Sequence, residues 1–369
     1  MRRRRPVDHI PHTRTKHDPF DSPHKCAIAG LTDKHKSFDF HLDDSCANHE
    51  PLANLDFHLN EHPRVGDYHL IELLGRGGQG EIWKALRTEP RIEFVALKLL
   101  SHKAKDDPAK LARFRREAER GAYLAHPGIL PVFEFGQHGT ILFFVMPLVC
   151  GFALSEILKQ RRQCRAGHPP LQVHRFAVLS EKQYIYAAVR VLTLVARALD
   201  DVHAARVVHC DVKPANVLLD CSNEDRVYLI DFGMGREVDA MPRTRAAHAA
   251  GTVLYMAPEK LLGHEVDEAL CDVYALGATA FETLTLRPPR IIPKNIPQLF
   301  WAKYIAMRDP PRPSSLVPRL PKQLDYILHR ALSRDPKRRY SSAGLMADDF
   351  EEFLLGTKLS GIQACQISP

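Results

Sequence analysis

The chain has 369 residues, of which 45% are apolar and 26% charged, so it is long enough for one large domain or two ordinary ones. The formal net charge of +7 invites a nucleic-acid partner, but residues 1–64 carry ten Lys or Arg and ten Asp or Glu, so the excess is spread over the remainder. With no run of about eighteen apolar residues and no signal-peptide core, we expect a soluble cytoplasmic protein without membrane insertion.

Residues 1–64 are rich in His, Asp, Pro and Ser and poor in periodic apolar positions, so we predict a tail that is disordered or only loosely docked. Its His and Cys spacings match no zinc module, which makes metal binding the weaker alternative. We interpret the basic cluster Arg2 to Arg5 as a solvated terminus rather than a contact with nucleic acid or acidic lipid. The eight cysteines form no CxxC pair, which favours a reducing compartment without disulfides.

Strands are predicted between residues 66 and 100, where YHLIELL, GEIWKAL and EFVALKLL are separated by turn residues. The first turn has the spacing G-x-G-x-x-G, at Gly75, Gly77 and Gly80. Because EIWKAL continues as a strand, the glycines do not fit a dinucleotide fold, in which a helix follows them. No Lys-Ser or Lys-Thr follows Gly80 either, which excludes a Walker loop.

Helices predominate further along the chain. A helix is predicted from about Pro108, and TILFFVMPLV at 140–149 predicts a buried strand. A polar insert at about 160–182 precedes a strongly amphipathic helix, and the segment from VYLIDFG to DDFEEFLL is expected to be largely helical. The inner face of the amphipathic helix is predicted to carry Ile185, Val189, Leu192, Ala196 and Leu199.

The segments VVHCDVKPANVLL (207–219) and VYLIDFG (227–233) carry the densest set of chemical groups. Phosphoryl transfer requires a carboxylate that takes the hydroxyl proton, a cation that screens the γ-phosphate, and an Asn and a second carboxylate that hold Mg²⁺. The two segments supply this set within about twenty residues, as Asp211, Lys213, Asn216 and Asp231.

Read with their neighbours, these segments make the chain resemble the protein kinase superfamily, and more closely the bacterial eukaryotic-like (Hanks-type) Ser/Thr kinases, over about 66–356. The signatures occur in order: Gly75-x-Gly77-x-x-Gly80-x-Ile82, Val95-Ala96-Leu97-Lys98, Glu117 in FRREAE, His209-Cys210-Asp211, Asp231-Phe232-Gly233, Ala257-Pro258-Glu259 and CDVYALG.

The resemblance implies an α+β, two-lobed protein-kinase fold. A small antiparallel sheet lobe with one helix would occupy about 66–149, and a larger, mainly helical lobe about 150–356, with a short tail at 357–369. The implied activity is transfer of the γ-phosphate of ATP, with Mg²⁺ or possible substitution by Mn²⁺, to Ser or Thr hydroxyls of a protein substrate.

The resemblance also implies roles at matching positions. The glycine loop would close over the ATP phosphates, and Lys98, paired with Glu117, would hold the α and β phosphates. Asp211 would be the base. Lys213 and Thr252 resemble the Ser/Thr-kinase catalytic loop, and Thr252 would brace the base and the lysine. Asn216 and Asp231 would bind the metal. The implied adenine pocket comprises Ile82, Ala96, Met146 as gatekeeper, Pro147, Val149 and Leu218.

Three further matches are structural. Glu259 and Arg339 match a buried ion pair, and Asp272 matches a helix residue that anchors the catalytic loop. In one departure from the family, Cys210 replaces an arginine that receives an activation-loop phosphate, so we expect activity that does not depend on phosphorylation of Thr244. We interpret Cys210 as a small buried residue, and a redox-sensitive thiol as the alternative.

In a second departure, Gly121 follows Glu117 by one turn, where relatives place a larger apolar residue. It suggests a less firmly preset Lys98–Glu117 pair, stabilised by a partner at the tail or the insert. The alternatives to a protein kinase are a pseudokinase scaffold and a small-molecule kinase. The scaffold is the weaker alternative because the chain has all of the expected catalytic groups, Lys98, Asp211, Asn216 and Asp231. The segment GTVLYMAPEK at 251–260, which resembles a peptide platform, argues against the small-molecule enzyme.

Overall fold

The computed structural model describes residues 62–356, apart from 77–79, 91, 101–106, 172, 222–225, 233–252 and 294. The predicted N-terminal tail, except its last residues, and the predicted C-terminal tail at 357–369 lie outside the described residues. Gly77, Thr244 and Thr252 lie outside them as well. Among the described residues, no helix combines the length and the apolar sequence that a membrane span requires.

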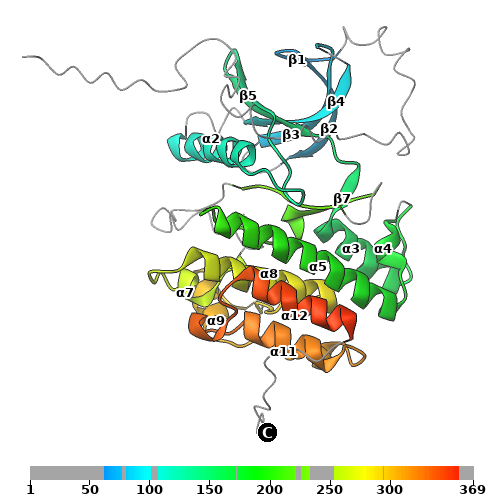
Figure 1. Ribbon diagram of the computed structural model, residues 1–369, viewed down its shortest axis with the longest axis vertical. Helices are drawn as coiled ribbons and strands as arrows, with labels where there is room; N and C mark the ends of the chain where they lie inside the picture. Colours follow the sequence, from blue (N-terminus) through cyan, green and yellow to red (C-terminus); the bar gives the residue numbers. More distant parts are fainter. Residues whose placement is uncertain are drawn as a thin grey trace, which may run out of the picture. The chain divides into compact units, whose positions relative to one another are not determined.

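Six antiparallel strands form the first sheet, in the order β1-β2-β3-β4-β6-β5 (Figure 1). All residues of the central strand β4 from Val95 to Leu100 are buried, Lys98 among them, so both faces of the strand are covered and its apolar residues do not alternate with exposed polar ones. The three strands predicted before residue 100 and the strand predicted at 140–149 are therefore confirmed. Their bounds are β1 Arg64–Val65, β2 Tyr68–Arg76, β3 Gly80–Arg87, β4 Glu93–Leu100, β5 Glu134–His138 and β6 Ile141–Pro147.

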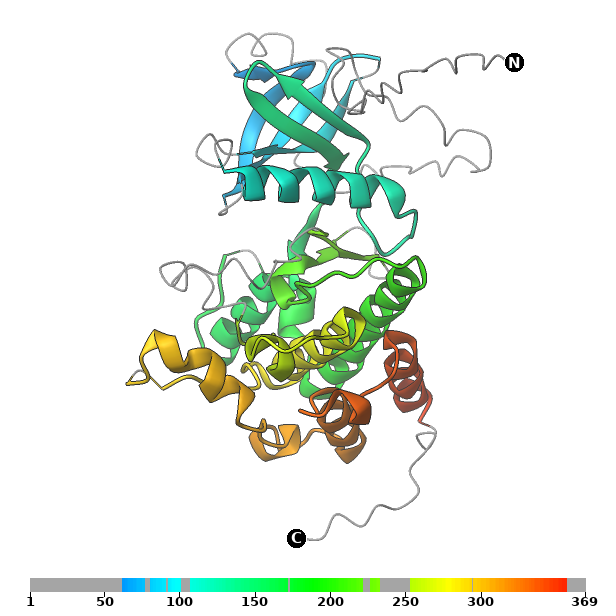
Figure 2. The same ribbon diagram turned by 90° about the vertical axis from the view of Figure 1, so that its left-hand side faces the viewer.

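Helix α2 (Pro108–Tyr123) runs along one face of this sheet (Figure 2). It begins where predicted, because the Asp107 side chain accepts hydrogen bonds from the amides of Ala109 and Lys110 and Pro108 occupies the first turn. Its apolar side packs on the sheet, with the Phe114 ring centroid 5.0 Å from that of Phe144. This contact fixes the helix that carries Glu117 against the strands.

Helices α3 (Leu154–Arg165), α4 (Arg175–Val178) and α5 (Glu181–Ala204) follow the first sheet. The five inner-face residues predicted for α5 are all buried, so that prediction is confirmed. The insert differs from the expectation, since residues 160–165 continue α3 rather than forming a polar excursion. Arg161 is buried within this helix. Its guanidinium lies 3.6 Å from the Tyr184 ring centroid and donates to the Leu179 carbonyl, and these contacts compensate for the lost hydration of the charge.

A second sheet of three short antiparallel strands, in the order β7-β8-β9, borders the helical part. The helical remainder predicted beyond it is confirmed, and its centre is α8, in which every residue from Cys271 to Thr285 is buried. The bounds are β7 Gly151–Ala153, η3 Pro214–Asn216, β8 Val217–Asp220, β9 Val227–Leu229, α7 Pro258–Leu261, α8 Glu268–Thr285, η5 Gln298–Phe300, α9 Trp301–Ala306, α10 Pro313–Leu316, α11 Lys322–Ala331, η6 Pro336–Arg338 and α12 Ala343–Leu355.

Candidate active site

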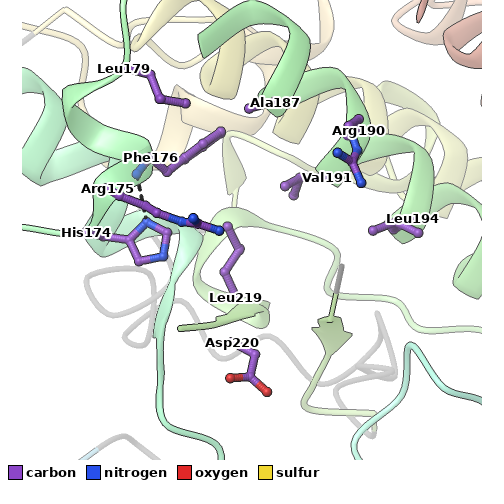
Figure 3. A pocket seen from close by; sticks show the side chains of 10 residues that line it. All are labelled: His174, Arg175, Phe176, Leu179, Ala187, Arg190, Val191, Leu194, Leu219 and Asp220. Carbon is purple, nitrogen blue, oxygen red and sulfur yellow. Dashed lines mark hydrogen bonds between the residues drawn. The ribbon is translucent and has the colours of Figure 1, made fainter. Parts of the chain in front are cut away.

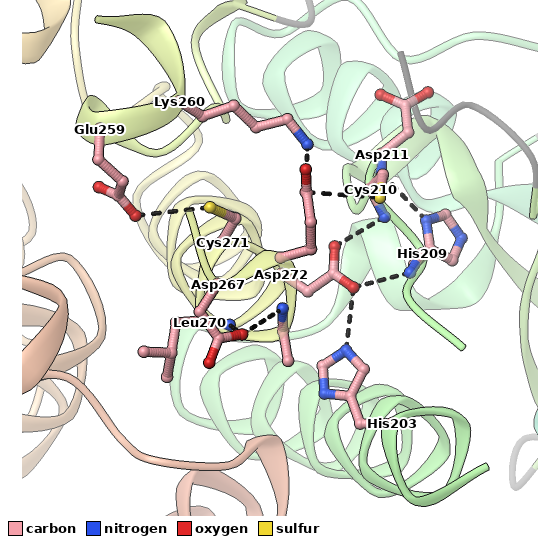
Figure 4. A network of polar contacts seen from close by, with 12 residues as sticks. His203, His209, Cys210, Asp211, Glu259, Lys260, Asp267, Leu270, Cys271 and Asp272 are labelled. Atoms are coloured by element: carbon pink, nitrogen blue, oxygen red, sulfur yellow. Dashed lines mark hydrogen bonds and ion pairs between the residues drawn. The ribbon is translucent and has the colours of Figure 1, made fainter. Parts of the chain in front are cut away.

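The loop before η3 is held by one carboxylate of helix α8. Asp272 is 1% exposed and accepts hydrogen bonds from the backbone amides of His209 and Cys210, each at 2.7 Å (Figure 4). The His203 ring nitrogen Nε2 also lies 2.9 Å from this carboxylate. Asp272 thus anchors the loop, as expected from the sequence, because two buried amides depend on it for their hydrogen bonds.

His209 ties this loop to the segment after β9. Its fully buried ring contacts the Ile230 carbonyl through Nε2 at 2.9 Å and accepts the Asp211 amide through Nδ1 at 3.2 Å. Burial lowers the pKa of His209, despite the nearby carboxylates, so the neutral imidazole carries its proton on Nε2. The ring also meets Phe232 edge-on at 4.5 Å between centroids. Asp211 and Asp231 are therefore positioned by a shared side chain.

The two carboxylate oxygens of Asp211 have different surroundings. Oδ2 accepts hydrogen bonds from Lys213 Nζ at 2.7 Å and from Asn216 Nδ2 at 3.2 Å. The same Asn216 nitrogen donates to the Asp211 carbonyl at 2.8 Å. Oδ1 is buried and accepts no hydrogen bond from any residue that the structure describes. One oxygen is thus held by two side-chain donors, whereas the other is buried without a hydrogen-bond donor among the described residues.

Lys98 on β4 lies between two carboxylates that come from different elements. Its ammonium donates to Glu117 of α2 and, at 2.7 Å, to Oδ1 of Asp231. Lys98 and Glu117 are 6% and 5% exposed, whereas the Asp231 side chain is 34% exposed. The structure therefore brings together the Lys98–Glu117 pair that the sequence predicts and adds Asp231 to it.

Burial opposes all three charges in this group. It lowers the pKa of Lys98, but attraction by Asp231 and Glu117 outweighs the burial and raises the pKa above its usual value. Burial likewise raises the pKa of Asp231, yet the Lys98 ammonium and the hydrogen bonds bring it down to about 2. For Glu117 burial prevails, and with the charge of Asp231 it raises the pKa to about 8. Asp231 therefore stays ionised at neutral pH.

The sequence and fold of this chain agree with those of known proteins. Residues 68–351 match the family model described as protein kinase domain. The chain belongs to the protein kinase family. It is 37% identical over 286 residues to the Ser/Thr-protein kinase PknD of Mycobacterium tuberculosis (strain ATCC 25618 / H37Rv), covering 77% of this chain and 39% of PknD.

Two further mycobacterial kinases are similar to it. PknA of M. tuberculosis (strain ATCC 25177 / H37Ra) is 34% identical over 297 residues, covering 78% of this chain and 62% of PknA. The crystal structure of the M. tuberculosis PknI kinase domain superimposes with a TM-score of 0.56 at 29% identity, covering 79% of this chain and 98% of that one. The chain thus spans less than two thirds of the length of the curated relatives it matches, but nearly all of the PknI kinase domain.

The structure describes two residues of the glycine loop, Gly75 and Gly80, and their surroundings differ. A Cβ atom on Gly80 would lie 1.8 Å from the Leu99 carbonyl oxygen, so the pairing of β3 with β4 itself demands glycine there. A Cβ on Gly75 would meet nothing within 4 Å. Close packing within the protein therefore explains Gly80, whereas the described surroundings impose no such demand on Gly75.

The residues predicted for the adenine pocket come from both sheets. Ile82 pairs with Lys98 across β3 and β4, and Ala96 pairs with Met146 across β4 and β6. Pro147 ends β6, Val149 lies in the connection to β7, and Leu218 on β8 pairs with Ala153. Ala96 thus lies on the same strand as Lys98, and Ile82 lies opposite Lys98 on the neighbouring strand.

Cys210 fills the place of the family arginine without becoming a reactive thiol. Burial, followed by the negative charge of Asp272, raises the pKa of its thiol to about 12. Its sulfur lies 3.6 Å from Glu268, which accepts a hydrogen bond from Lys260 at 2.5 Å. Cys210 is partly buried, and its raised pKa favours the interpretation as a small packed residue over a redox-sensitive thiol. Sequence reasoning missed Glu268, because nothing in its local pattern indicates that it faces the catalytic loop.

Gly121 has a packing role that the sequence did not indicate. A Cβ there would lie 2.5 Å from Val132 Cγ2, and the Val132 amide donates to the Gly121 carbonyl at 3.1 Å. The glycine lets α2 approach the segment before β5. Helix α2 nevertheless continues unbroken to Tyr123, and the Lys98–Glu117 pair is formed, so how firmly the pair is preset stays a prediction.

An ion pair and a pocket lie away from the catalytic loop. Arg339 forms a two-point ion pair with Glu259, with both contacts at 2.7 Å, as expected from the family match. A pocket of about 180 Å³ between α4, α5 and β8 shares no residue with the catalytic loop or the Lys98 group (Figure 3). It is lined by His174, Arg175, Phe176, Leu179, Ala187, Arg190, Val191, Leu194, Leu219 and Asp220.

Proposed function

We propose that this chain is an ATP-dependent Ser/Thr protein kinase whose catalytic domain occupies about 66–356, with lobes at about 66–149 and 150–356. The observation that carries the proposal is the asymmetry of Asp211, whose Oδ2 is held by Lys213 and Asn216 while its buried Oδ1 has no hydrogen-bond donor among the described residues. A Ser or Thr hydroxyl that donates to Oδ1 would satisfy this oxygen and be oriented for attack.

Lys98 is the group proposed to contact the α and β phosphates of ATP. Glu117 and Asp231 both attract the Lys98 ammonium. The Lys98 side chain is therefore held in place beside its strand and stays protonated. Gly75 supports the same reading, since its open surroundings give a ligand backbone access. Gly77 and Gly80 complete the proposed phosphate loop, and the adenine would lie among Ile82, Ala96, Met146, Pro147, Val149 and Leu218.

Asn216 and Asp231 fit a hard divalent cation, Mg²⁺ or in its place Mn²⁺. The Asn216 amide nitrogen is engaged by Asp211, which leaves its carbonyl oxygen as the remaining ligand atom. The Asp231 carboxylate is ionised and one-third exposed. Oxygen donors of this kind suit Mg²⁺, which when bound neutralises charge on the phosphates.

We also propose that a regulatory partner binds the N-terminal tail or the insert, and that the protein is cytoplasmic.

Independence from activation-loop phosphorylation is part of the same proposal. Cys210 cannot pair with a phosphate, and the nearby Lys260 is already engaged by Glu268. Transfer by an enzyme with Thr244 replaced by Ala should match that of wild type. A large rise in rate when Thr244 is phosphorylated would contradict it.

The deciding experiment is transfer of the ATP γ-phosphate, in Mg²⁺, to the protein itself and to a generic Ser/Thr acceptor. Asp211→Asn is the matched control, because the amide keeps the size of the side chain but cannot take the proton. Transfer that disappears in this variant supports the kinase. Nucleotide binding without transfer in wild type would favour the alternative, a pseudokinase or kinase-like scaffold.

A further inference from the structure

Two cysteines stand opposite each other where the chain passes from the first sheet to the second. The register of β7 and β8 pairs Gly151 with Asp220, and the Cys221 amide donates to the Cys150 carbonyl at 2.8 Å. This hydrogen bond lies just beyond the last paired residues of the two strands, Gly151 and Asp220, so Cys150 and Cys221 are the next residues in the register. Both side chains are exposed to solvent.

Side-chain alternation decides which face of the strands the thiols share. Residues at directly opposite positions point to the same face, and neighbours along a strand point to opposite faces. Cys150 and Cys221 therefore lie on the face of the Phe152–Leu219 pair. Leu218, the residue proposed to line the adenine site, points to the other face. A reagent can thus reach the thiols without entering the nucleotide site.

The spacing of such a pair suits a disulfide. Opposite residues in a hydrogen-bonded antiparallel pair have Cα atoms about 5.5 Å apart, and disulfides bridge Cα atoms about 4.4–6.8 Å apart. We propose that Cys150 and Cys221 are a redox modification site, which a hydroperoxide converts into a reversible cross-strand disulfide. The spacing of cysteines along the sequence does not reveal the pair, because the two positions are 71 residues apart.

The chemistry needs only the two thiols and the peroxide. One cysteine, as thiolate, attacks hydrogen peroxide, so that an S–O bond forms, the O–O bond breaks and hydroxide leaves. The second sulfur then attacks the sulfenic acid, the S–S bond forms and water leaves. In sum, two thiols lose two electrons and two protons, and one peroxide becomes two waters. An exposed disulfide of this kind is readily reduced by an external thiol, which restores both cysteines.

Other cysteines in the described part of the chain provide comparators. Burial raises the pKa of Cys210 and of Cys271, so little reactive thiolate forms at either. Cys164 belongs to helix α3 and not to the β7–β8 ladder, which makes Cys164→Ser a matched control. Cys150 and Cys221 should consequently react first and with each other.

The test maps disulfides in the full, reduced chain after treatment with hydrogen peroxide, followed by alkylation. Trypsin releases Cys150 in the peptide 121–159, and cleavage before Asp211 and Asp220 separates Cys221 from Cys210. The expected product is a cross-linked peptide pair that lacks two hydrogen atoms and separates on reduction. It should persist in Cys164→Ser, disappear in Cys150→Ser and Cys221→Ser, and form within single molecules at any protein concentration.

Diamide serves as a second oxidant, so that slow reaction with peroxide is not decisive. The proposal is overturned if both cysteines remain fully alkylated after both oxidants. It is equally overturned if either cysteine pairs preferentially with Cys26, Cys46 or Cys365, or with another molecule. Because the readout is a mass and not a rate, the result does not depend on the proposed kinase activity.

Discussion

At the scale of single residues, the site depends on how the Lys98 ammonium balances two carboxylates. Glu117 is buried and Asp231 partly exposed, and both contact the same nitrogen. Removing one partner of a buried ion pair leaves an unpaired charge, whereas replacing both by apolar groups does not. The contribution of the pair to stability can therefore be separated from its role in function.

We predict that Lys98→Met lowers the free energy of unfolding by about 1–3 kcal/mol, because the buried Glu117 carboxyl group loses the hydrogen bond from the Lys98 ammonium. The double variant Lys98→Met with Glu117→Leu should recover most of this loss, and phosphoryl transfer should stay absent in both. Urea unfolding and a transfer assay measure the two effects. A double variant as unstable as Lys98→Met would show that the unpaired Glu117 carboxyl group is not the cause of the lost stability.

At the scale of elements, helix α8 supports the catalytic loop through Asp272. Its two carboxylate oxygens accept the His209 and Cys210 amides, and both amides belong to the loop that carries Asp211. Asp267, at the start of the same helix, accepts the amides of Ala269 and Leu270 instead. Asp267 thus caps helix α8, whereas Asp272, within the same helix, binds the loop (Figure 4).

Asp272→Asn should destabilise the protein by about 1–3 kcal/mol, because an amide has a single acceptor oxygen and one buried N–H loses its partner. Transfer should fall strongly as the loop shifts. Asp267→Ala is the matched control, which costs about 0.5–2 kcal/mol through the lost helix cap. Its transfer rate at a temperature well below unfolding should equal that of wild type. Equal losses of rate in both variants would argue against a specific positioning role.

Helix α2 offers a second test at this scale, which concerns its close approach to Val132. Gly121→Ala would normally stabilise a helix by about 1 kcal/mol. Here the added Cβ would collide with Val132 Cγ2, so we expect a net loss of about 1–3 kcal/mol from overpacking. Adding Val132→Ala should relieve the collision and recover stability, as measured by thermal unfolding. A stabilised Gly121→Ala protein would show that the neighbour moves aside.

Particular elements show what the sequence could and could not predict. Residues whose periodicity or motif is local were placed correctly, including the strand of Lys98, the start of α2 at Pro108 and the inner face of α5. The role of Gly121 and the burial of Arg161 depend on contacts with residues distant in sequence or in another helix. No local pattern records such contacts, so only the packed structure could reveal them.

At the scale of the whole molecule, the described chain has separate apolar cores. One includes Tyr68 and Leu97 of the first sheet, another packs α2 on that sheet, and the largest surrounds α5 and α8. The chain connects the first sheet to the helical part after β6, and Lys98 of the sheet also contacts Asp231, which follows β9. A ligand that contacts residues from both parts should consequently stabilise them together.

Nucleotide binding provides the test at this scale. A non-hydrolysable ATP analogue with Mg²⁺, at about one hundred times its dissociation constant, should add about 2.7 kcal/mol to the free energy of unfolding and raise Tm. A chelator should reduce the shift, since the metal is proposed to join the phosphates to Asn216 and Asp231.

Two variants separate metal binding from catalysis. Asp231→Asn should lose the metal-dependent part of the stability gain, because the amide is a weaker ligand without charge. Asp211→Asn should keep the full shift while transfer is lost, which separates binding from catalysis. If the shift were insensitive to the chelator and to Asp231→Asn, nucleotide would be binding without the proposed metal site.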